Sequence, residues 1–439
     1  MSETQGFTRD LLVALSGRLG EPSWVLDLRL AAFAQFEATA YPTTDNEEDW
    51  RRTDLRGVDF DALATLAQPN GFRGHGLSAE ACAGAIRFAD GAVVETRLDA
   101  DLAARGVVWC SLHEAIARWP ERVREHFMTR CVQPGEDKFT LLHAAFWNQG
   151  LFCWAPAGVT VEQPLLALIE LGDQGGSLLH HSLVVAGEGA SLSLVEAYAG
   201  ADTAAALSVP VCEVIAEAGA EVAYASVQSW GAKVVEVATK RALTARDAAV
   251  HLCVGNLGGR VVKTFAGAVL AAPGSAVDLL GLAFPGRGQH LDQTTVQDHR
   301  APDCTSNLLF KAAVTDDARS VFRGVINVHP EAQRTDAYQT NNNLLLGEGA
   351  EADSMPVLEI LADDVKCSHG ATLASVDEED IFYLMSRGLP RAVAQRMVIA
   401  GFFEPVLARI PVDSVRGQLQ RLVEDRIDQQ ARGSAGLGD

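Results

Sequence analysis

The stretch Gly189-Ala-Ser-Leu-Ser-Leu-Val-Glu196 holds the pattern that decides the fold. A glycine and a small residue form a turn, and the residues after it alternate between apolar and polar side chains. Alternation over a short run predicts a β-strand, because successive side chains of a strand point to opposite faces. Similar runs, in which Lys, Glu and Pro are scarce, fill the chain from about residue 139 to 361; examples are Gly158-Val-Thr-Val-Glu162, Ser182-Leu-Val-Val-Ala186 and Val261-Val-Lys-Thr-Phe265. The middle of the chain is therefore expected to consist of strands.

The turn at the start of this stretch recurs at intervals of about thirty residues, with one longer gap. A Gly or an acidic residue precedes a small one at Gly189-Ala190, Gly219-Ala220, Asp247-Ala248, Gly274-Ser275, Asp317-Ala318 and Gly349-Ala350. A fixed period of this size is typical of a solenoid, in which each coil contacts only its neighbours. A β-sandwich with regular hairpins is the alternative, but the Asn-Gly and Asp-Gly hairpin signals are missing from this region. We therefore expect a β-helix.

The regions on either side of the strands have a helical pattern. Trp24 to Phe36 carries apolar residues at helical spacing, and Ser111 to Arg130 fits a second helix with a capping box of Ser111 and Glu114. We therefore predict an N-terminal helical domain over 1–138 and a parallel β-helix core over 139–374.

The chain is expected to end in a helical domain over 375–439. Asp377 to Asp380 places acidic residues before the run from Ile381 to Arg387, as a helix dipole favours. Further helices are predicted from Pro390 to Ala408 and from Pro411 to Arg432, followed by a loose tail. These terminal helices are expected to cap the solenoid, because an uncovered last coil would expose a sheet edge.

The composition limits where the protein works and what it binds. Asp and Glu outnumber Lys and Arg by 57 to 36, which leaves a net charge of −21 that disfavours nucleic acid and anionic lipid. The first twenty residues mix charged and apolar side chains and do not form a signal peptide. Eight scattered cysteines without a C-x-x-C pair suit reduced thiols in a cytosol. We expect a cytoplasmic protein that binds neither membrane nor nucleic acid.

Familiar catalytic motifs are missing from the sequence. There is no Walker phosphate loop, no Gly-x-Gly-x-x-Gly opening a helix, no Gly-x-Ser-x-Gly elbow and no His-Glu-x-x-His pair. A β-helix polysaccharide enzyme would need stacked carboxylates or basic residues, which the sequence does not demonstrate. The chain is expected to be a non-catalytic protein, with a stand-alone β-helix enzyme as the rival.

One local cluster could bind a metal: Lys366-Cys367-Ser368-His369-Gly370. Cys367 and His369 are two positions apart, so in a strand they point to the same side, about 6–7 Å apart. Thiolate and imidazole suit iron, zinc or copper(I), and Lys366 is expected to help keep the thiol ionised. Two ligands do not complete a site, so the others must come from elsewhere in this chain or from another chain. A buried Cys beside an exposed His with no metal remains the alternative.

The neighbouring polar residues support weaker expectations. His180 and His181 are adjacent in a strand, so they point to opposite faces and are not expected to bind one metal together. Gln339-Thr-Asn-Asn-Asn343 is interpreted as an amide ladder that serves the structure of a coil.

The sequence closely resembles the SufB/SufD family, the scaffold proteins of the SUF system of iron–sulfur cluster assembly. The resemblance rests on three segments: Tyr338-Gln-Thr-Asn-Asn-Asn-Leu-Leu-Leu346, Pro356-Val-Leu-Glu-Ile-Leu-Ala-Asp-Asp-Val-Lys-Cys-Ser-His-Gly-Ala-Thr372 and Phe382-Tyr-Leu-Met-Ser-Arg-Gly-Leu389. Within the family the chain looks like SufD, because SufB typically carries Glu in place of Gly370. The stretches Glu21 to Trp24 and Trp50 to Leu55 also resemble the helical domain of SufD.

The resemblance implies a fold, partners and a site. The fold is a right-handed parallel β-helix flanked by N-terminal and C-terminal helical domains. The last coils would pair with SufB, and the C-terminal helices would dock the ATPase SufC. His369 would contribute to a transient iron–sulfur cluster shared with SufB, with Cys367 as a companion ligand. Reduced flavin in the complex and a homodimer of the isolated chain are further implications, and a SufB-type role is the alternative.

Overall fold

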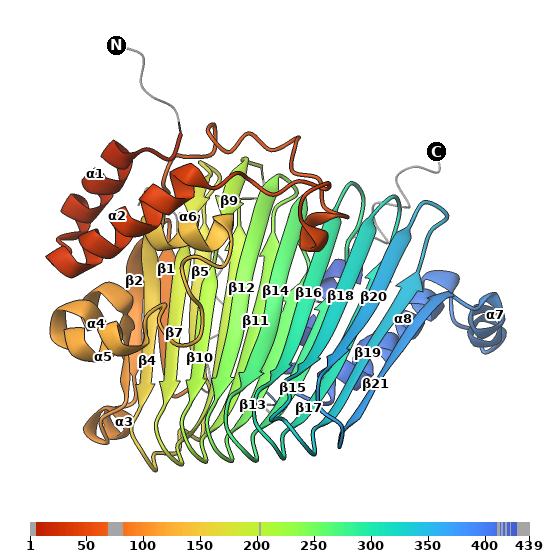
Figure 1. Cartoon of the computed structure of the whole chain (residues 1–439). Coiled ribbons are helices and arrows are strands. Elements are labelled where there is room, and N and C mark those ends of the chain that lie inside the picture. Colours follow the sequence, from red (N-terminus) through yellow and green to blue (C-terminus); the bar gives the residue numbers. More distant parts are fainter. Residues whose placement is uncertain are drawn as a thin grey trace.

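The computed structural model describes residues 6–68, 82–201 and 203–410, together with 413, 416, 417, 419–421 and 423–427. Most of the molecule is a parallel β-solenoid, in which each coil contributes a strand to each of two facing sheets (Figure 1). The expected mainly-β fold with helices at both ends is confirmed.

One sheet has ten strands, in which only the first pair, β2 and β1, is antiparallel. In spatial order its strands are β2 (Ala92–Leu98), β1 (Gly84–Ala89), β5 (Leu165–Leu171), β8 (Ser191–Gly200), β11 (Glu221–Trp230), β13 (Ala249–Asn256), β15 (Ala276–Ala283), β17 (Thr305–Val314), β19 (Asp336–Leu345) and β21 (Lys366–Ser375).

The second sheet has eleven strands and is parallel except for the pair of β3 and β4. Its main path runs through β20 (Glu351–Ile360), β18 (Arg319–Val328), β16 (His290–His299), β14 (Val261–Leu270), β12 (Val234–Thr244), β10 (Val211–Ala216), β7 (His180–Ala186), β4 (Gln149–Ala155) and β3 (Val108–Ser111). The short strands β6 (Gly176–Leu178) and β9 (Ala206–Ser208) pair beside β12.

The coils stack in register, so like positions form rows inside the solenoid. Val184, Val214 and Ala242 lie side by side in β7, β10 and β12 and belong to one buried core. Burying such apolar rows is the main stabilising contribution to the solenoid. The parallel pairing between successive coils excludes the sandwich of hairpins.

The recurring turns have the conformation that their residues allow. Gly189, Gly219, Asp247 and Gly274 have φ of 62°, 66°, 57° and 77°, a left-handed region that Gly adopts freely and Asp tolerates. At the fifth expected position Asp316, not Asp317, has positive φ. The small residue that follows each of these turns is buried, because it sits at a corner where successive coils stack closely; the set is Ala190, Ala220, Ala248, Ser275 and Ala318.

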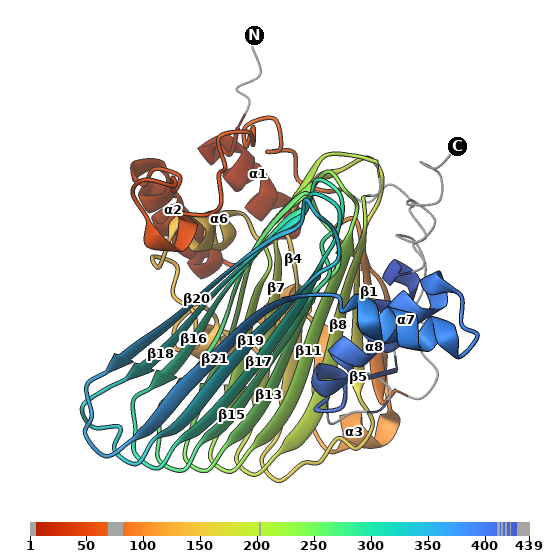
Figure 2. The ribbon, with the colours of Figure 1, turned by 90° about the vertical axis from the view of Figure 1, so that its right-hand side faces the viewer.

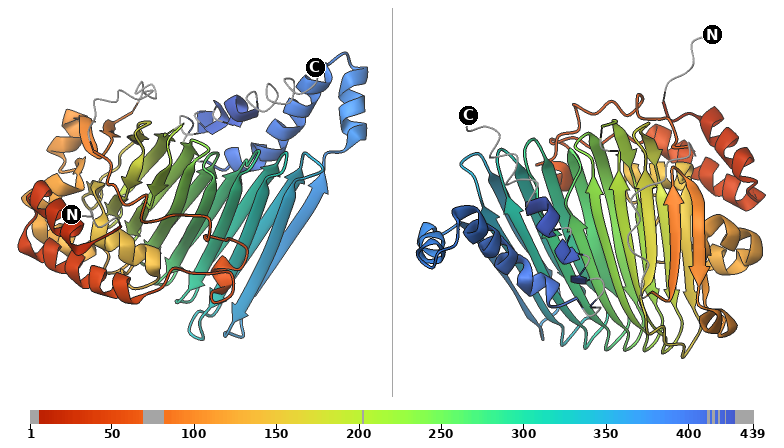
Figure 3. Two further views of the ribbon diagram at one scale, coloured as in Figure 1. Left: turned by 90° about the horizontal axis from the view of Figure 1, so that it is seen from above. Right: turned by 180° about the vertical axis from the view of Figure 1, so that it is seen from behind.

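Helices at the N-terminal end cover the outer face of the second sheet (Figures 1 and 3). They are α1 (Arg9–Leu19), α2 (Ser23–Ala38), α4 (Leu112–Arg118), α5 (Pro120–His126) and α6 (Lys138–Phe146), and their apolar residues form one core with β4, β7 and β12. The expected helix from Trp24 to Phe36 is confirmed by α2. The expected helix from Ser111 to Arg130 is divided instead, because Trp119 leaves the helical conformation and Pro120 begins the next helix.

The N-terminal region is less helical than expected. It also contains β1, β2, β3 and the short helix α3 (Ala100–Ala104), and β1 extends the ten-stranded sheet by pairing with β5. The turn between β1 and β2 is Asp90-Gly91, where both residues have positive φ. An Asp-Gly turn between apolar runs is a strong hairpin signal, and it was present in the sequence.

Residues 48–57, called the strap below, lie across the outer face of the second sheet, where Asp49, Thr53 and Gly57 contact β18, β16 and Arg260. The short 3-10 helix η1 (Glu48–Trp50) places the buried Trp50 ring 5.2 Å from Phe139 and 5.9 Å from Phe265. Lys263 and Asp292, both almost fully buried, form an ion pair of 2.9 Å beneath it. The strap therefore ties the N-terminal region to the middle coils.

The C-terminal helices α7 (Glu378–Ser386) and α8 (Arg391–Leu407) confirm the two helices expected in that part of the chain. Buried residues of α8 pack on the outer face of the ten-stranded sheet, where Phe403 lies 5.9 Å from Phe284. The helix α8 packs on this outer face because the face carries apolar residues such as Leu280 and Leu309, which α8 buries. Residues described between 413 and 427 are helical, and the expected loose tail lies outside the described residues.

The expectation that these helices cap the solenoid is wrong for the described part of the chain. The last strands β20 and β21 carry no further strand, and their residues are mostly half-buried or exposed (Figure 2). The solenoid therefore ends in an open coil. Among the described residues, no helix has the length and apolar character needed to cross a bilayer.

Candidate functional site

Cys367 and His369 lie on β21, the last strand of the ten-stranded sheet. In register they stand next to Ala337 and Gln339 of β19, whose side chains are buried inside the solenoid. Since paired residues of a parallel sheet point to the same face, both side chains lie on the inner face of the last coil. Cys367 is half-buried against Ala337, whereas His369 is exposed because no coil covers it.

The thiol of Cys367 is not the ready thiolate that the sequence suggested. Its burial, together with the negative charge of nearby Asp336, raises its pKa above the ordinary value. The expectation that Lys366 keeps the thiol of Cys367 ionised is wrong. Asp336, which pairs in register with Lys366, adds a negative charge near the thiol, and this charge opposes its ionisation. A bound metal would have to supply the charge that deprotonates this thiol.

The two side chains do not make a complete metal site within the described chain. Nowhere in its described ranges do three His, Cys, Asp or Glu side chains gather so that they could hold one metal ion. Gly370, next to His369, also contributes no ligand, although a Cβ there would meet only Tyr338 Oη, at 3.4 Å. The glycine at this position is therefore not required by packing.

Beneath the pair lies a buried row of amides. Gln339, Asn341 and Asn343 alternate along β19 and point into the solenoid, as the interpretation of this segment as a structural ladder predicted. Gln339 donates to the carbonyl of Gly324 at 3.2 Å, and Asn343 donates to Asn341 at 2.7 Å. Within the described residues Gln339 Oε1 has no hydrogen-bond partner, so the coil beneath His369 retains a polar acceptor.

The open coil also exposes apolar side chains. Leu361 and Leu373 are 67% and 58% exposed, and Ile360 at the end of β20 is partly exposed. The outer edges of β20 and β21 carry backbone groups that no strand of the described chain pairs. Unpaired edges with apolar residues are the features by which sheets recruit another chain.

The adjacent histidines His180 and His181 point to opposite faces, as expected. The ring of His180 lies 5.0 Å from Phe88 inside the solenoid, whereas His181 accompanies Phe127 beneath the N-terminal helices. The expected placement of the two rings on opposite faces of the strand is confirmed.

Sequence reasoning missed a buried hydrogen-bond chain that includes His181. His181 Nε2 lies 3.2 Å from Glu213 Oε1, and His181 Nδ1 lies 3.0 Å from Nε2 of His143. His143 Nδ1 in turn lies 2.7 Å from the carbonyl of Val209. The Glu213 carboxyl group also accepts hydrogen bonds from two backbone N–H groups of the loop that follows α5. No local sequence motif predicts this hydrogen-bond chain, because its residues come from segments that are distant in the sequence.

Burial controls the protonation of this chain. It raises the pKa of Glu213 to about 8 and lowers the pKa of His181 to about 3. His181 Nδ1–H donates to His143 Nε2, and His143 Nδ1–H donates to the carbonyl of Val209. Within the described residues His181 Nε2 faces Glu213 Oε1 at 3.2 Å without the geometry of a hydrogen bond. The arrangement suits structure better than metal binding.

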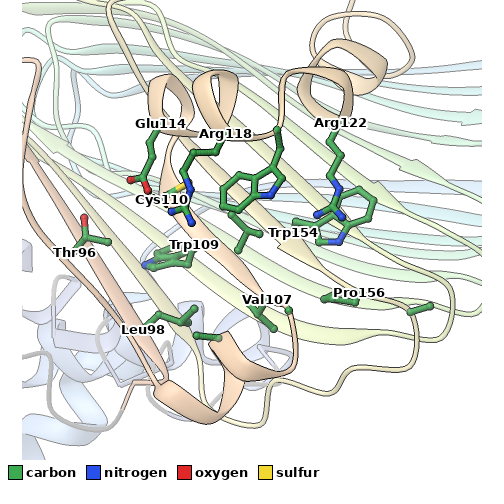
Figure 4. A pocket seen from close by; sticks show the side chains of 15 residues that line it. Thr96, Leu98, Val107, Trp109, Cys110, Glu114, Arg118, Arg122, Trp154 and Pro156 are labelled. Carbon is green, nitrogen blue, oxygen red and sulfur yellow. Dashed lines mark hydrogen bonds and ion pairs between the residues drawn. The ribbon is translucent and has the colours of Figure 1, made fainter.

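A cavity of about 670 Å³ lies at the other end of the solenoid, next to β3 (Figure 4). Its lining includes Trp109, Trp119 and Trp154 together with Arg118 and Arg122. It is far from β21 along the solenoid, since α4 and α5 lie at the N-terminal end (Figure 1). It is therefore a feature separate from the cysteine–histidine pair.

Comparisons with known proteins show which protein family this chain resembles. A model described as the SufBD core domain of the SUF system of FeS cluster assembly matches residues 169–402, and a model of the N-terminal region of SufBD proteins matches residues 84–166. The iron–sulfur cluster assembly protein SufB of Bacillus subtilis is 27% identical over 429 residues, covering 93% of this chain and 90% of the relative. SufBD family proteins of Staphylococcus saprophyticus and Staphylococcus epidermidis match with the same identity and coverage.

Proposed function

The chain belongs to the SufBD family of iron–sulfur cluster assembly proteins, and we propose that it is a SufD-type scaffold subunit that works with SufB and the ATPase SufC. The observation that carries the proposal is the position of Cys367 and His369, which lie on the inner face of an uncovered last coil. A second solenoid that continues this coil would bring its own ligands to the same place. The nascent cluster is then cargo built between two chains.

His369 is the principal ligand in this proposal. It is exposed, and a neutral imidazole binds iron well near neutral pH. Cys367 is the secondary ligand, because its half-buried thiol has a raised pKa and must lose its proton to bind. An incomplete ligand set on one chain favours release of the cluster once the partner chains separate.

The SufD assignment is supported by what the open coil lacks. Gly370 leaves no carboxylate beside His369 even though a side chain would fit, which suits a helper subunit better than the principal scaffold. Identity to a protein named SufB does not separate the two roles at 27%. A SufB-type scaffold is therefore the competing assignment.

The surfaces left open support two partner sites. Leu361 and Leu373 on the open coil suit pairing with SufB. On α7, Phe382 and Tyr383 are 73% and 57% exposed, and Met397 of α8 is half exposed, which suits docking of SufC. In this scheme the division at about 138 and 374 separates a stabilising N-terminal part, the cluster-building solenoid and a docking part, and ATP hydrolysis is left to SufC in the cytoplasm.

The test is substitution of His369 in the complex. His369→Ala should leave binding of SufB and SufC intact in size-exclusion chromatography. Anaerobic reconstitution should then yield little iron and sulfide per complex, because one ligand of the cargo is lost. Ser368→Ala is the matched control, since Ser368 lies on the same strand but points to the opposite face.

The outcomes separate the candidates. Full cluster yield from the His369→Ala complex contradicts the ligand role. Normal yield after loss of both Cys367 and His369, with failure only after removal of 377–432, indicates a purely structural adaptor. Stable cluster binding by this chain alone favours the SufB-type role, and turnover of a polysaccharide without partners favours a stand-alone enzyme.

A further inference from the structure

The cavity at the N-terminal end of the solenoid has the walls of a ligand site. It lies between the edge strands β2 and β3 and beneath α4 and α5, and its volume of about 670 Å³ falls in the range of small-molecule pockets. Thr96 and Leu98 of β2 form one side, and Val107 and Pro156 lie below (Figure 4). The five consecutive elements β2, α3, β3, α4 and α5 thus meet β4 around one space.

Three indole rings make the lining aromatic. Trp109 comes from β3, Trp154 from β4 and Trp119 from the junction of α4 and α5. The two guanidinium groups of the cavity lie over two of these rings, Arg118 at 4.4 Å from the centre of Trp119 and Arg122 at 5.0 Å from that of Trp154. Indole faces bind flat aromatic groups and cations, so the lining favours a planar ligand.

The cavity also carries a positive charge that the described part of the chain does not neutralise. Arg118 forms an ion pair of 2.7 Å with Glu114, but no carboxylate in the described part of the chain pairs with Arg122. Figure 4 shows both arginines reaching from the helices toward the cavity. In a protein with 57 acidic residues and 36 basic ones, an unpaired arginine over an aromatic wall favours an anionic group.

A buried donor in the lining has no acceptor among the residues that the structure describes. Trp109 is 4% exposed, and within the described residues its Nε1 has no hydrogen-bond partner. An unsatisfied buried N–H costs free energy that a ligand acceptor would recover. This donor is independent of the arginine, and because its Nε1 has almost no accessible surface, an acceptor atom reaches it only when the lining shifts as a ligand enters.

The lining is not suited to chemistry. The only thiol is Cys110, and its burial raises its pKa to about 12, so it stays neutral. Glu114, its only carboxyl group, is committed to Arg118. The cavity is equipped to bind and not to react.

We propose that this cavity binds a planar aromatic molecule that carries a phosphate or a carboxylate. The ring lies against the indoles of Trp119 and Trp154, the acid group pairs with Arg122, and an acceptor atom receives the N–H of Trp109. Because α4 and α5 also pack on the N-terminal core, an occupant stabilises that end of the solenoid. This role is additional to cluster assembly and does not depend on it.

Tryptophan fluorescence of the purified full-length chain provides the test, because three of its seven tryptophans line the cavity. Adenosine 5′-monophosphate and benzoate are the phosphate and carboxylate probes, since neither emits in the tryptophan region. Adenosine and benzamide are their neutral counterparts, and inorganic phosphate is the ring-free counterpart of the first. We expect saturable quenching by at least one charged probe and binding about tenfold weaker, or worse, for its counterparts.

Two variants locate the binding. Arg122→Gln should weaken binding of the charged probe about tenfold or more and leave adenosine unchanged, while Trp109→Phe removes the N–H together with the five-membered ring and should also weaken binding of the charged probe. Arg124→Gln is the matched control, since Arg124 is on α5 but lies over Trp24, outside the cavity. Equal melting temperatures of the unliganded variants exclude loss of fold. The proposal is overturned if neither charged probe binds below about 1 mM, or if Arg122→Gln and Arg124→Gln behave alike.

Discussion

At the scale of single residues, the surroundings of a side chain decided its chemistry. Lys366 is next to Cys367 in sequence and was expected to favour the thiolate. In the solenoid the neighbour in space is Asp336 of the preceding coil, and burial together with this carboxylate raises the pKa of Cys367. The same effect keeps Glu213 protonated where a surface glutamate would be ionised.

Glu213→Gln should change how stability depends on pH. The pKa of Glu213 is raised from 4.5 to about 8, so the stability that its proton contributes is complete below about pH 4.5 and is lost as the pH rises through 8. Glutamine does not titrate. Urea unfolding between about pH 5 and 8.5 should therefore show the wild type losing about 2–4 kcal/mol relative to the variant.

Glu217→Gln is the control for this measurement, because Glu217 is partly exposed and pairs with Arg130 at the surface. It should follow the wild-type curve. Parallel pH profiles for the wild type and Glu213→Gln would contradict the protonated state of the buried chain.

At the scale of elements, the strap shows how a segment with little regular structure becomes fixed. Its Trp50 fills a space between α6 and β14, and its Asp49 pairs with Arg323 of β18 at 2.8 Å. Below it, the Lys263 ammonium pairs with Asp292 in surroundings that exclude water. Such a pair depends on both partners, since either charge alone would be buried without compensation.

Lys263→Met should destabilise the protein by about 3–5 kcal/mol, because it leaves the Asp292 carboxylate buried without its partner. The free energy of urea unfolding measures the loss. Adding Asp292→Asn should recover part of it. Arg56→Gln, which breaks an exposed pair with Asp54, should leave stability unchanged. A small effect of Lys263→Met, equal to that of Arg56→Gln, would show that the strap region is open to water.

At the scale of the whole molecule, the two ends of the solenoid differ. The N-terminal end is closed by antiparallel strands and helices, whereas the C-terminal end is an open coil (Figures 1 and 2). An open coil with unpaired edges favours association with a second solenoid. The isolated chain, without its proposed partner, is then expected to form a homodimer through this end.

Leu373→Asp should weaken this association, because it places a charge on an apolar residue of the open coil that is largely exposed in the monomer. Light scattering coupled to size-exclusion chromatography should show the wild type as a dimer and the variant shifted toward monomer. Val94→Asp, an exposed residue on β2 at the opposite end, is the control and should remain dimeric. A dimer that persists in Leu373→Asp and dissociates in Val94→Asp would place the interface at the N-terminal end of the solenoid and contradict the prediction.

Much of the fold was predictable because its signals are local. Alternation marked the strands, the Gly or Asp turns marked the coils, and α2, α7 and α8 followed from helical spacing. The hairpin at Asp90-Gly91 was equally readable from its turn residues and was overlooked. The division of α4 from α5 was also signalled, by Pro120.

The sequence by itself determined that the chain forms stacked coils and that Cys367 and His369 share one face of a strand, because both depend on spacing along the backbone. Only the tertiary structure decided that this face belongs to an uncovered coil, that α8 packs beside the solenoid and not over its end, that Asp336 opposes ionisation of Cys367, and that Glu213 meets His181. These outcomes depend on contacts between residues far apart in the chain. Such contacts are set by which apolar faces and charges meet after folding, and no local pattern specifies them.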